Sequence, residues 1–278
     1  MTQEHLTDEE LKQKLVADSI QSEQYQFPTE TIDLPSKGHF YDPDSPLAAG
    51  TIEMKYPTAK EEDILTSQNL IKNGTVIDKF IKSCLVTKIN YNDLLIGDKN
   101  ALMVAARILA YGAKYEVNVT CPECGNKSKE VINLSECDDK EIDFAAYPKG
   151  TTVFEMTLPA SKRKITYQLM THGLEEKVEE EMKRFKKKNK RSGVDSDLTT
   201  RMKQVIISVD GNDDFNHVSN FVDNEFLSRD SQAFRAQIKS HTPDVEMTFE
   251  FECEKCGYEE VSDFPITAGF FYPDSRIS

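Results

Sequence analysis

Two short cysteine motifs constrain the fold of this chain most strongly: CPECG at residues 121–125 and CEKCG at residues 253–257. In the residues before each motif, 115–119 and 247–251, apolar side chains alternate with polar ones, and the alternation keeps the same position relative to the first cysteine. Alternation with a period of two is typical of a β-strand with one buried face. Each motif is therefore predicted to form the tip of a β-hairpin, so the chain contains an internal repeat of strand, tip and strand.

Four cysteines on two such tips match a tetrahedral zinc ribbon, in which Cys121, Cys124, Cys253 and Cys256 bind one zinc ion per chain. The glycine that ends each motif can adopt a positive φ, which suits a tight turn around the sulfurs. Four thiolates leave the ion no open coordination position, so the predicted role of the zinc is structural. Iron, a redox dithiol and two unrelated turns are the alternatives. The redox dithiol is disfavoured because a thioredoxin-type C-x-x-C opens a helix, whereas these tips lie between strands.

The composition favours bound metal over disulfides. The chain has 278 residues, a net charge of −14 and no apolar run long enough to cross a membrane. Its N-terminus, MTQEHLTDEE, lacks a basic patch followed by an apolar stretch, so we expect no signal peptide and a reducing compartment. The acidic balance argues against a general nucleic-acid or membrane-surface binder. Of the remaining cysteines, Cys84 is predicted to be a core residue and Cys137 a free surface thiol.

The expected fold class is α+β, with a mixed α/β segment inserted between the two hairpins. We divide the chain into an N-terminal helix and turn-rich arm (1–57), a helical segment (58–112), the first half of the zinc ribbon (113–150), the inserted segment (151–244), and the second half of the ribbon with an aromatic tail (245–278). In the helical segment, Thr58 and Glu61 have capping-box spacing. Asp98 is expected to cap a later helix, and Gly112 to end that helix in the left-handed conformation.

The inserted segment is predicted to contain strands at 153–158 and 165–170, then helices over 174–191 and 198–209 and two short helices within 216–240. Its first helix ends in the strongly basic run KRFKKKNKR, at residues 183–191. A basic run beside a zinc ribbon suggests nucleic-acid binding. However, glutamates precede the lysines, which is the arrangement that the helix dipole and i,i+4 pairing favour. We therefore prefer a solvated helix end and keep a nucleic-acid-binding regulator as an alternative function.

Three regions are candidate surfaces for partner proteins. Residues 6–20 are predicted to form an amphipathic helix, residues 34–46 a chain of turns, and the C-terminal tail an aromatic cluster. The candidate partner-binding residues are Leu11, Leu15, Phe40, Tyr41, Phe270, Phe271 and Tyr272. Exposed aromatic residues often mark a partner site, although the same aromatic turns could instead anchor the core.

Motifs of catalysis are missing from the sequence. It contains no G-x-x-x-x-G-K-[ST], G-x-G-x-x-G, G-x-S-x-G or H-E-x-x-H motif, and its five histidines are scattered. With 48 acidic residues, pairs of carboxylates are expected by chance and carry no weight. We therefore expect a protein that is not an enzyme and has no small-molecule substrate.

Several blocks of the sequence stand in the order of a known protein family. They are LPSKGHFY (34–41), EEDILTSQNLIKNG (61–74), GDKNALMVAARIL (97–109), YGAKYEVNVTCPECG (111–125) and FLSRDSQAFR (226–235). Together they resemble the baseplate hub assembly proteins of T-even-type contractile-tailed bacteriophages. The resemblance covers roughly residues 30–275, and its most specific part is 61–125.

The resemblance implies a virion morphogenesis factor that helps to assemble the central hub of the tail baseplate in the host cytoplasm. Its implied partners are other baseplate hub proteins, reached through protein–protein contacts rather than through a membrane or nucleic acid. The resemblance leaves open whether the chain stays in the finished virion, so a permanent structural subunit of the baseplate is a further alternative.

Overall fold

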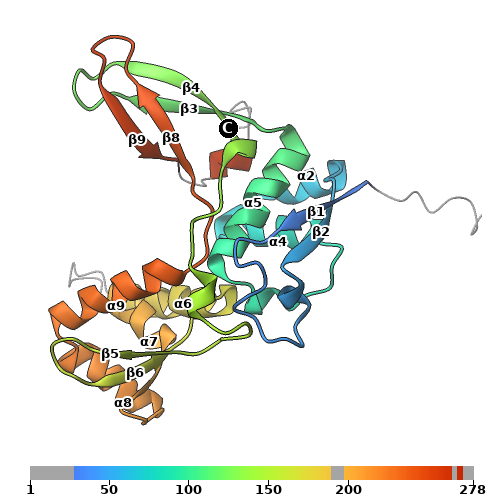
Figure 1. The fold of residues 1–278 in the computed structure, drawn as a ribbon. Coiled ribbons are helices and arrows are strands. Elements are labelled where there is room, and N and C mark those ends of the chain that lie inside the picture. The colour runs from blue at the N-terminus through green and yellow to red at the C-terminus, as the bar shows by residue number, and fades with distance from the viewer. Residues whose placement is uncertain (1–27, 189–196, 265–267, 272–278) are drawn as a thin grey trace, which may run out of the picture.

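The structure, a computed structural model, describes residues 28–188, 197–264 and 268–271. In this part of the chain, eight α-helices and four small antiparallel sheets form three lobes (Figure 1). The described chain is a mixture of helices and small antiparallel sheets, which agrees with the predicted α+β class. The helix predicted over residues 6–20 lies outside the described residues. None of the described helices combines the length and the apolar character that a bilayer span requires.

The first lobe combines a hairpin with the predicted helical segment. Its elements are β1 (Thr29–Asp33), η1 (Pro46–Ala49), β2 (Thr51–Lys55), α2 (Ala59–Leu65), α3 (Gln68–Asn73), α4 (Val76–Cys84), η2 (Tyr91–Asp93) and α5 (Ile96–Tyr111). The predicted capping box is present at the start of α2, where the Thr58 backbone N–H donates to the Glu61 carboxylate at 2.9 Å. Helical spacing of apolar residues places Phe80 and Cys84 in the core, as predicted for that cysteine.

The turn-rich stretch between β1 and β2 packs on the start of α5 through one buried carboxylate, Asp98. This carboxylate accepts hydrogen bonds from the Ser36 backbone N–H at 2.9 Å and from the Tyr41 hydroxyl at 2.5 Å. Burial raises the pKa of Asp98, and the hydrogen bonds offset part of the cost of removing this carboxylate from water. The expectation that Asp98 caps the helix is wrong. Leu95 occupies the cap position, and Asp98 lies inside the first turn.

The second lobe contains both predicted hairpins. Hairpin 1 pairs β3 (Lys114–Thr120) with β4 (Lys127–Asn133), and hairpin 2 pairs β8 (Thr248–Glu252) with β9 (Glu259–Asp263). Short 3-10 turns follow at η3 (Leu134–Glu136), η4 (Phe144–Ala146) and η6 (Ala268–Phe271). Gly112 ends α5 ahead of hairpin 1 with a φ of 83° and a ψ of 169°. Its φ is positive, a conformation that favours glycine, but its ψ lies outside the left-handed helical region that we predicted for it.

The third lobe is the inserted α/β segment. Its elements are β5 (Phe154–Thr157), β6 (Lys164–Tyr167), α6 (His172–Lys188), α7 (Asp197–Val205), β7 (Ile206–Val209), α8 (Phe215–Asn220), the π-helix η5 (Phe221–Glu225) and α9 (Ser228–His241). The strands form one antiparallel sheet in the order β5-β6-β7. The prediction that a helix extends to residue 209 is wrong. Residues 206–209 are an apolar run too short for its periodicity to separate strand from helix, and they pair with β6.

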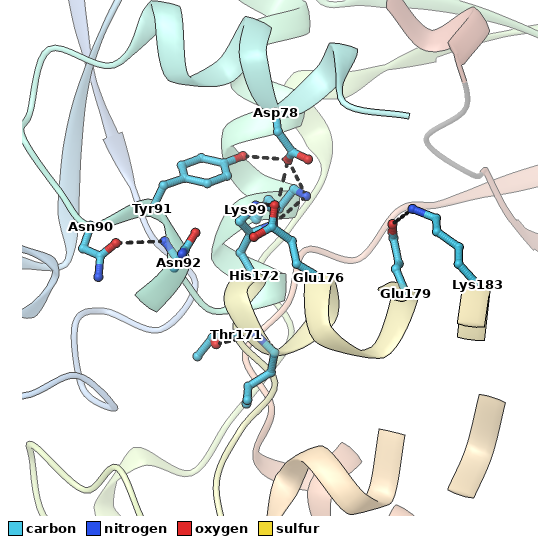
Figure 2. A network of polar contacts seen from close by, with 11 residues as sticks. Asp78, Asn90, Tyr91, Asn92, Lys99, Thr171, His172, Glu176, Glu179 and Lys183 are labelled. Atoms are coloured by element: carbon cyan, nitrogen blue, oxygen red, sulfur yellow. Dashed lines mark hydrogen bonds and ion pairs between the residues drawn. The ribbon is translucent and has the colours of Figure 1, made fainter. Parts of the chain in front are cut away.

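A polar network with Tyr91 and His172 buried at its centre joins the first and third lobes (Figure 2). Asp78 of α4 accepts a 2.6 Å ion pair from Lys99 of α5 and a 3.2 Å hydrogen bond from the Tyr91 hydroxyl. Lys99 also donates to Nδ1 of His172, the first residue of α6, at 3.2 Å, and Nε2 of this histidine lies 3.5 Å from Glu176. Burial and the neighbouring ammonium group lower the pKa of His172. The network therefore holds α6 against α4 and α5.

The inserted segment leaves and re-enters the rest of the chain at one place. Asp139 forms a β-bridge with Val245, flanked by two backbone hydrogen bonds, from Lys140 N–H to Asp244 O and from Glu246 N–H to Asp138 O, of 2.9 and 2.8 Å. Beside this pairing, a Cβ on Gly97 would lie 1.8 Å from the carbonyl oxygen of Pro243. The insertion is therefore closed at its base and sits tightly on α5. The exact division into five segments stays a prediction.

One hydrophobic core runs through the first and third lobes and reaches the C-terminal turn η6. Its largest fully buried side chains include Phe80, Tyr167, Phe221, Phe234, Phe270 and Phe271. The hairpins have a separate small cluster around their tips, whose buried members are Cys121, Phe251 and Cys253. The hairpin lobe therefore has little apolar burial of its own.

Candidate metal centre

The two hairpin tips have the same local structure. In each tip the glycine N–H donates to the carbonyl of the first cysteine, at 2.9 Å from Gly125 to Cys121 and at 2.8 Å from Gly257 to Cys253. Both glycines are left-handed, with φ of 67° and 68°. A side chain in that conformation would be strained, which accounts for glycine at the end of both motifs.

The tips bring four sulfur atoms together. The Sγ atoms of Cys121, Cys124, Cys253 and Cys256 all lie within 4.8 Å of one another. The two cross-hairpin distances, Cys121 to Cys256 and Cys124 to Cys253, are both 3.6 Å. Four thiolates around zinc, with Zn–S bonds of about 2.3 Å, require sulfurs about 3.8 Å apart. The sulfur spacing therefore fits a tetrahedral ion, although the geometry alone does not assign the metal.

The environment of the cysteines favours a thiolate over four neutral thiols. Burial works to raise the pKa of Cys253, but backbone N–H groups of Cys256 and Lys255 outweigh it and lower this pKa to about 6. At Cys256 a backbone N–H lowers the pKa, whereas burial and the neighbouring sulfurs raise it, to about 12 overall. One negative charge is thus held on the cluster and the next is opposed by the first. A cation at the centre would remove this opposition, and its binding would release protons.

The remaining two cysteines lie away from the cluster. Cys84 is fully buried in the first lobe, where burial raises its pKa to about 11. Cys137, predicted to be a free surface thiol, is half-buried and packs against the main core. Burial and the adjacent acidic residues Asp138 and Glu136 raise its pKa as well. Neither thiol has the surroundings of a metal ligand or a reactive cysteine.

Four of the seven predicted partner-binding residues are core residues in the structure. Phe40 and Tyr41 pack beneath the turns that follow β1, and Phe270 and Phe271 are fully buried in η6. Phe271 meets Phe80 edge to face, with the ring centroids 5.4 Å apart. A side chain with almost no exposed surface cannot contact a partner unless the fold opens. These four residues therefore belong to the core and not to a docking surface. Their aromatic character reflects internal packing.

The other three predicted partner-binding residues, Leu11, Leu15 and Tyr272, lie outside the described residues. The described part of the basic run starts on α6, where Lys183 and Arg184 form i,i+4 ion pairs with Glu179 and Glu180 at 3.1 and 3.3 Å. Figure 2 shows the first of these pairs on the helix surface. These pairs are the ones expected of a solvated helix end.

Two buried carboxylates have structural roles that local sequence patterns do not indicate. The pattern around Asp98 predicts a helix cap, and Asp230 lies inside the family-like block 226–235 without a signal of its own. Asp230 accepts hydrogen bonds from the backbone N–H groups of Ala160 and Ser161 at 2.6 and 3.0 Å. These bonds lower its pKa against the opposing effect of burial. The carboxylate thereby fixes the turn between β5 and β6.

A comparison with protein-family models matches the family described as T4 bacteriophage base plate protein, over residues 27–272. The match spans most of the chain. The chain belongs to the T4 bacteriophage base plate protein family. Neither the curated proteins nor the solved structures gave a match.

The structure explains why several family-like blocks of this base plate protein are needed for the fold. The 34–41 block supplies Ser36 and Tyr41, and the 97–109 block supplies Asp98, the carboxylate that both of them contact. The latter block also supplies Gly97, which permits the close approach of Pro243. These two blocks therefore pack the turns after β1 on α5 and bring the base of the inserted segment close to α5.

Proposed function

We propose that this chain is a morphogenesis factor that assists assembly of the central hub of the phage tail baseplate through protein–protein contacts. The observation that carries this proposal is membership of the base plate protein family over residues 27–272. The resemblance of the 34–125 blocks to hub assembly proteins supports the finer role. We further propose that the chain acts without enzymatic activity, in the host cytoplasm, before or during formation of the tail.

The second part of the proposal is a structural zinc ion held by Cys121, Cys124, Cys253 and Cys256. The sulfur spacing supports it, and so does the donor set, because four cysteines form closed sites of the kind that zinc occupies. The ion would supply a cross-link between segments that are far apart in the sequence. Its energetic weight would be large here, because the hairpin lobe buries few apolar side chains.

The nucleic-acid alternative receives no support from the described residues. Lys183 and Arg184 are engaged by glutamates on their own helix, and the net charge of the chain is −14. We expect that DNA or RNA does not bind at physiological salt. A permanent structural subunit of the baseplate remains the competing role, because family membership is compatible with both.

Co-expression of the tagged chain with the other baseplate proteins of its phage tests the proposal. We expect a hub protein to co-purify with the chain, and we expect the chain to be missing from purified virions. Finding the chain in virions at a fixed ratio to other tail proteins would favour the permanent subunit instead. The absence of any co-purifying tail protein would count against both roles.

The predicted N-terminal helix gives a sharper version of this experiment. We expect Leu11→Asp with Leu15→Asp to abolish co-purification, because a docked apolar face would be broken. Gln13→Asp is the matched control, since it adds a carboxylate off the predicted apolar face. Equal loss in both variants would mean that the apolar face is not the contact.

A further inference from the structure

Each hairpin has an inner face toward the cysteine cluster and an outer face toward solvent. Directly paired residues of antiparallel strands share one face, so the strand register assigns every side chain. The outer face of hairpin 1 consists of the pairs Lys114–Asn133, Glu116–Val131, Asn118–Lys129 and Thr120–Lys127. The outer face of hairpin 2 consists of Thr248–Asp263, Glu250–Val261 and Glu252–Glu259. All of these residues are exposed.

The two outer faces carry opposite charge. On hairpin 1, which we call the basic face, three lysines stand with one glutamate. On hairpin 2, which we call the acidic face, four carboxylates stand with no lysine or arginine. Glu252 and Glu259 even lie directly opposite each other, an arrangement that destabilises an isolated sheet. The repulsion on the acidic face would be relieved by a surface of opposite charge.

Each outer face also presents one valine opposite a glutamate. Val131 is 61% exposed and Val261 is 65% exposed, and these are the two largest values among the big apolar side chains of the described residues. The next most exposed, Phe215, is at 53%. Valines this exposed bury only a minor part of their side chains within their own chain. The two faces are therefore complementary in charge, and each presents an apolar side chain opposite a glutamate.

Both faces are sterically accessible. The hairpin lobe stands away from the other two lobes (Figure 1). At the base of hairpin 2, the acidic face continues into an open groove of about 760 Å³ lined by Val245, Met247, Val261 and Phe264. Because the inner faces of both hairpins pack around the sulfurs, the two outer faces point away from each other. The basic face of a molecule cannot reach its own acidic face.

We propose that the chain self-associates head to tail, with the basic face of one copy packed on the acidic face of a second copy. Lys127 and Lys129 meet carboxylates such as Glu252 and Glu259, and the two valines lie in mutual contact. A second copy suits the acidic face because it offers the complementary charge together with an apolar side chain at the matching place. The contact joins two different surfaces, so it leaves one face of each copy free and can propagate.

Electrostatics make this association weak and sensitive to salt. A face of two short strands is smaller than the interfaces of permanent dimers, and exposed ion pairs contribute little singly. The net charge of −14 opposes close approach of two copies. At physiological ionic strength, charges more than about 8 Å apart are screened, so the facing groups outweigh the distant ones. We expect self-association to weaken by roughly tenfold or more between low and high salt.

Sedimentation velocity of the full-length, reduced protein with zinc supplied tests the proposal through a charge exchange. We expect Glu252→Lys with Glu259→Lys to be monomeric, because two lysines then balance Glu250 and Asp263 and the face keeps no net negative charge to attract the basic face. We expect Lys127→Glu with Lys129→Glu to be monomeric as well, because the outer face of hairpin 1 is then acidic and repels the acidic face of hairpin 2. An equimolar mixture of the two variants should associate again, since each supplies the face that the other lacks. Unchanged circular dichroism and melting temperature would show that both variants fold.

Two results would overturn the proposal. The first is a wild-type chain that remains monomeric at low salt at every concentration tested. This result would overturn the proposal even if a lysine-rich peptide bound to the acidic face. Association of the wild type that persists in both variants, or a mixture that stays monomeric, would place the contact elsewhere. Val261→Ser should weaken wild-type association without changing its salt dependence, and no effect would contradict the apolar contact.

Discussion

The hairpin lobe and the main body of this protein are held together in different ways. The main body has one continuous core that links the first and third lobes, with buried carboxylates where the segments meet. The hairpin lobe has three buried residues around its tips, and two of them are cysteines. An isolated two-stranded hairpin is marginally stable at best in water. Cross-linking by a metal can therefore replace a core where the chain provides none.

The largest expected effect comes from breaking the hairpin lobe without touching the main body. Cys121→Ser or Cys253→Ser removes one ligand from a site whose binding free energy is on the order of 10 kcal/mol. We expect loss of about one zinc per chain, and rapid amide hydrogen exchange in residues 114–133 and 248–263. Exchange in α4 and α5 should remain slow, because the buried residues of these helices belong to the main core and not to the cluster around the sulfurs.

Cys137→Ser is the matched control for this comparison, because it removes a cysteine that lies outside the cluster. Metal analysis of freshly reduced protein measures the zinc content, and mass spectrometry measures the amide hydrogen exchange. A wild-type chain without metal would contradict the zinc site. Global unfolding of the ligand variants would contradict the separation of the two regions.

The main body is most sensitive where the inserted segment meets α5. Gly97→Ala places a Cβ 1.8 Å from the carbonyl oxygen of Pro243, a backbone atom that cannot rotate away. We expect a loss of about 3 kcal/mol or more in the free energy of unfolding, measured by denaturant titration, with the zinc content unchanged.

Gly173→Ala is the graded control for the Gly97 variant. Its Cβ would meet Asn92 at 3.1 Å, a distance that a small adjustment can relieve. Alanine is also favoured over glycine inside a helix by up to about 1 kcal/mol. We therefore expect a change within about 1 kcal/mol. Equal losses in the free energy of unfolding of the two variants would show that the close approach of Gly97 and Pro243 does not limit stability more than the contact of Gly173 with Asn92 does.

Local patterns explain why the hairpins were predictable and the packing of the main body was not. Strand alternation and the C-x-x-C-G tips are contained in a few consecutive residues, and metal chemistry requires distant cysteines to meet. Burial of Phe40 or Phe271 depends on which segments pack above them, and an aromatic sequence is equally compatible with a core and with a surface. The role of Asp98 is hidden from local patterns for the same reason, because its partners Ser36 and Tyr41 come from another part of the chain.

Acid should weaken the main body through a buried histidine. His241 packs against Phe154 and lies 3.3 Å from the Tyr167 hydroxyl, and burial lowers its pKa from 6.5 to about 4. The unfolded chain therefore binds this proton more readily than the folded chain. The stabilisation is complete above pH 6.5 and is lost as pH falls toward 4, by at most about 3 kcal/mol.

Denaturant titrations between pH 7.5 and pH 4.5 measure this dependence. His241→Phe keeps an aromatic ring of similar size beside Phe154 and removes the titrating group, so we expect a flatter dependence of stability on pH. The hairpin lobe is a different case, because acid protonates thiolates and releases metal. Metal content should therefore be followed in the same samples. A His241→Phe profile that parallels the wild-type profile would assign the acid sensitivity to other groups.

The smallest expected effect concerns the exposed surface of α6. Lys183→Gln with Arg184→Gln removes two i,i+4 ion pairs that lie in solvent. Exposed pairs of this kind contribute within about 0.5 kcal/mol, so the melting temperature should be almost unchanged. The same variant should leave co-purification with hub proteins intact, because we assign no partner to this helix end. A large drop in the melting temperature or in co-purification would mean that the basic run has a role beyond its ion pairs. Nucleic-acid binding by the wild type would then be the first property to measure.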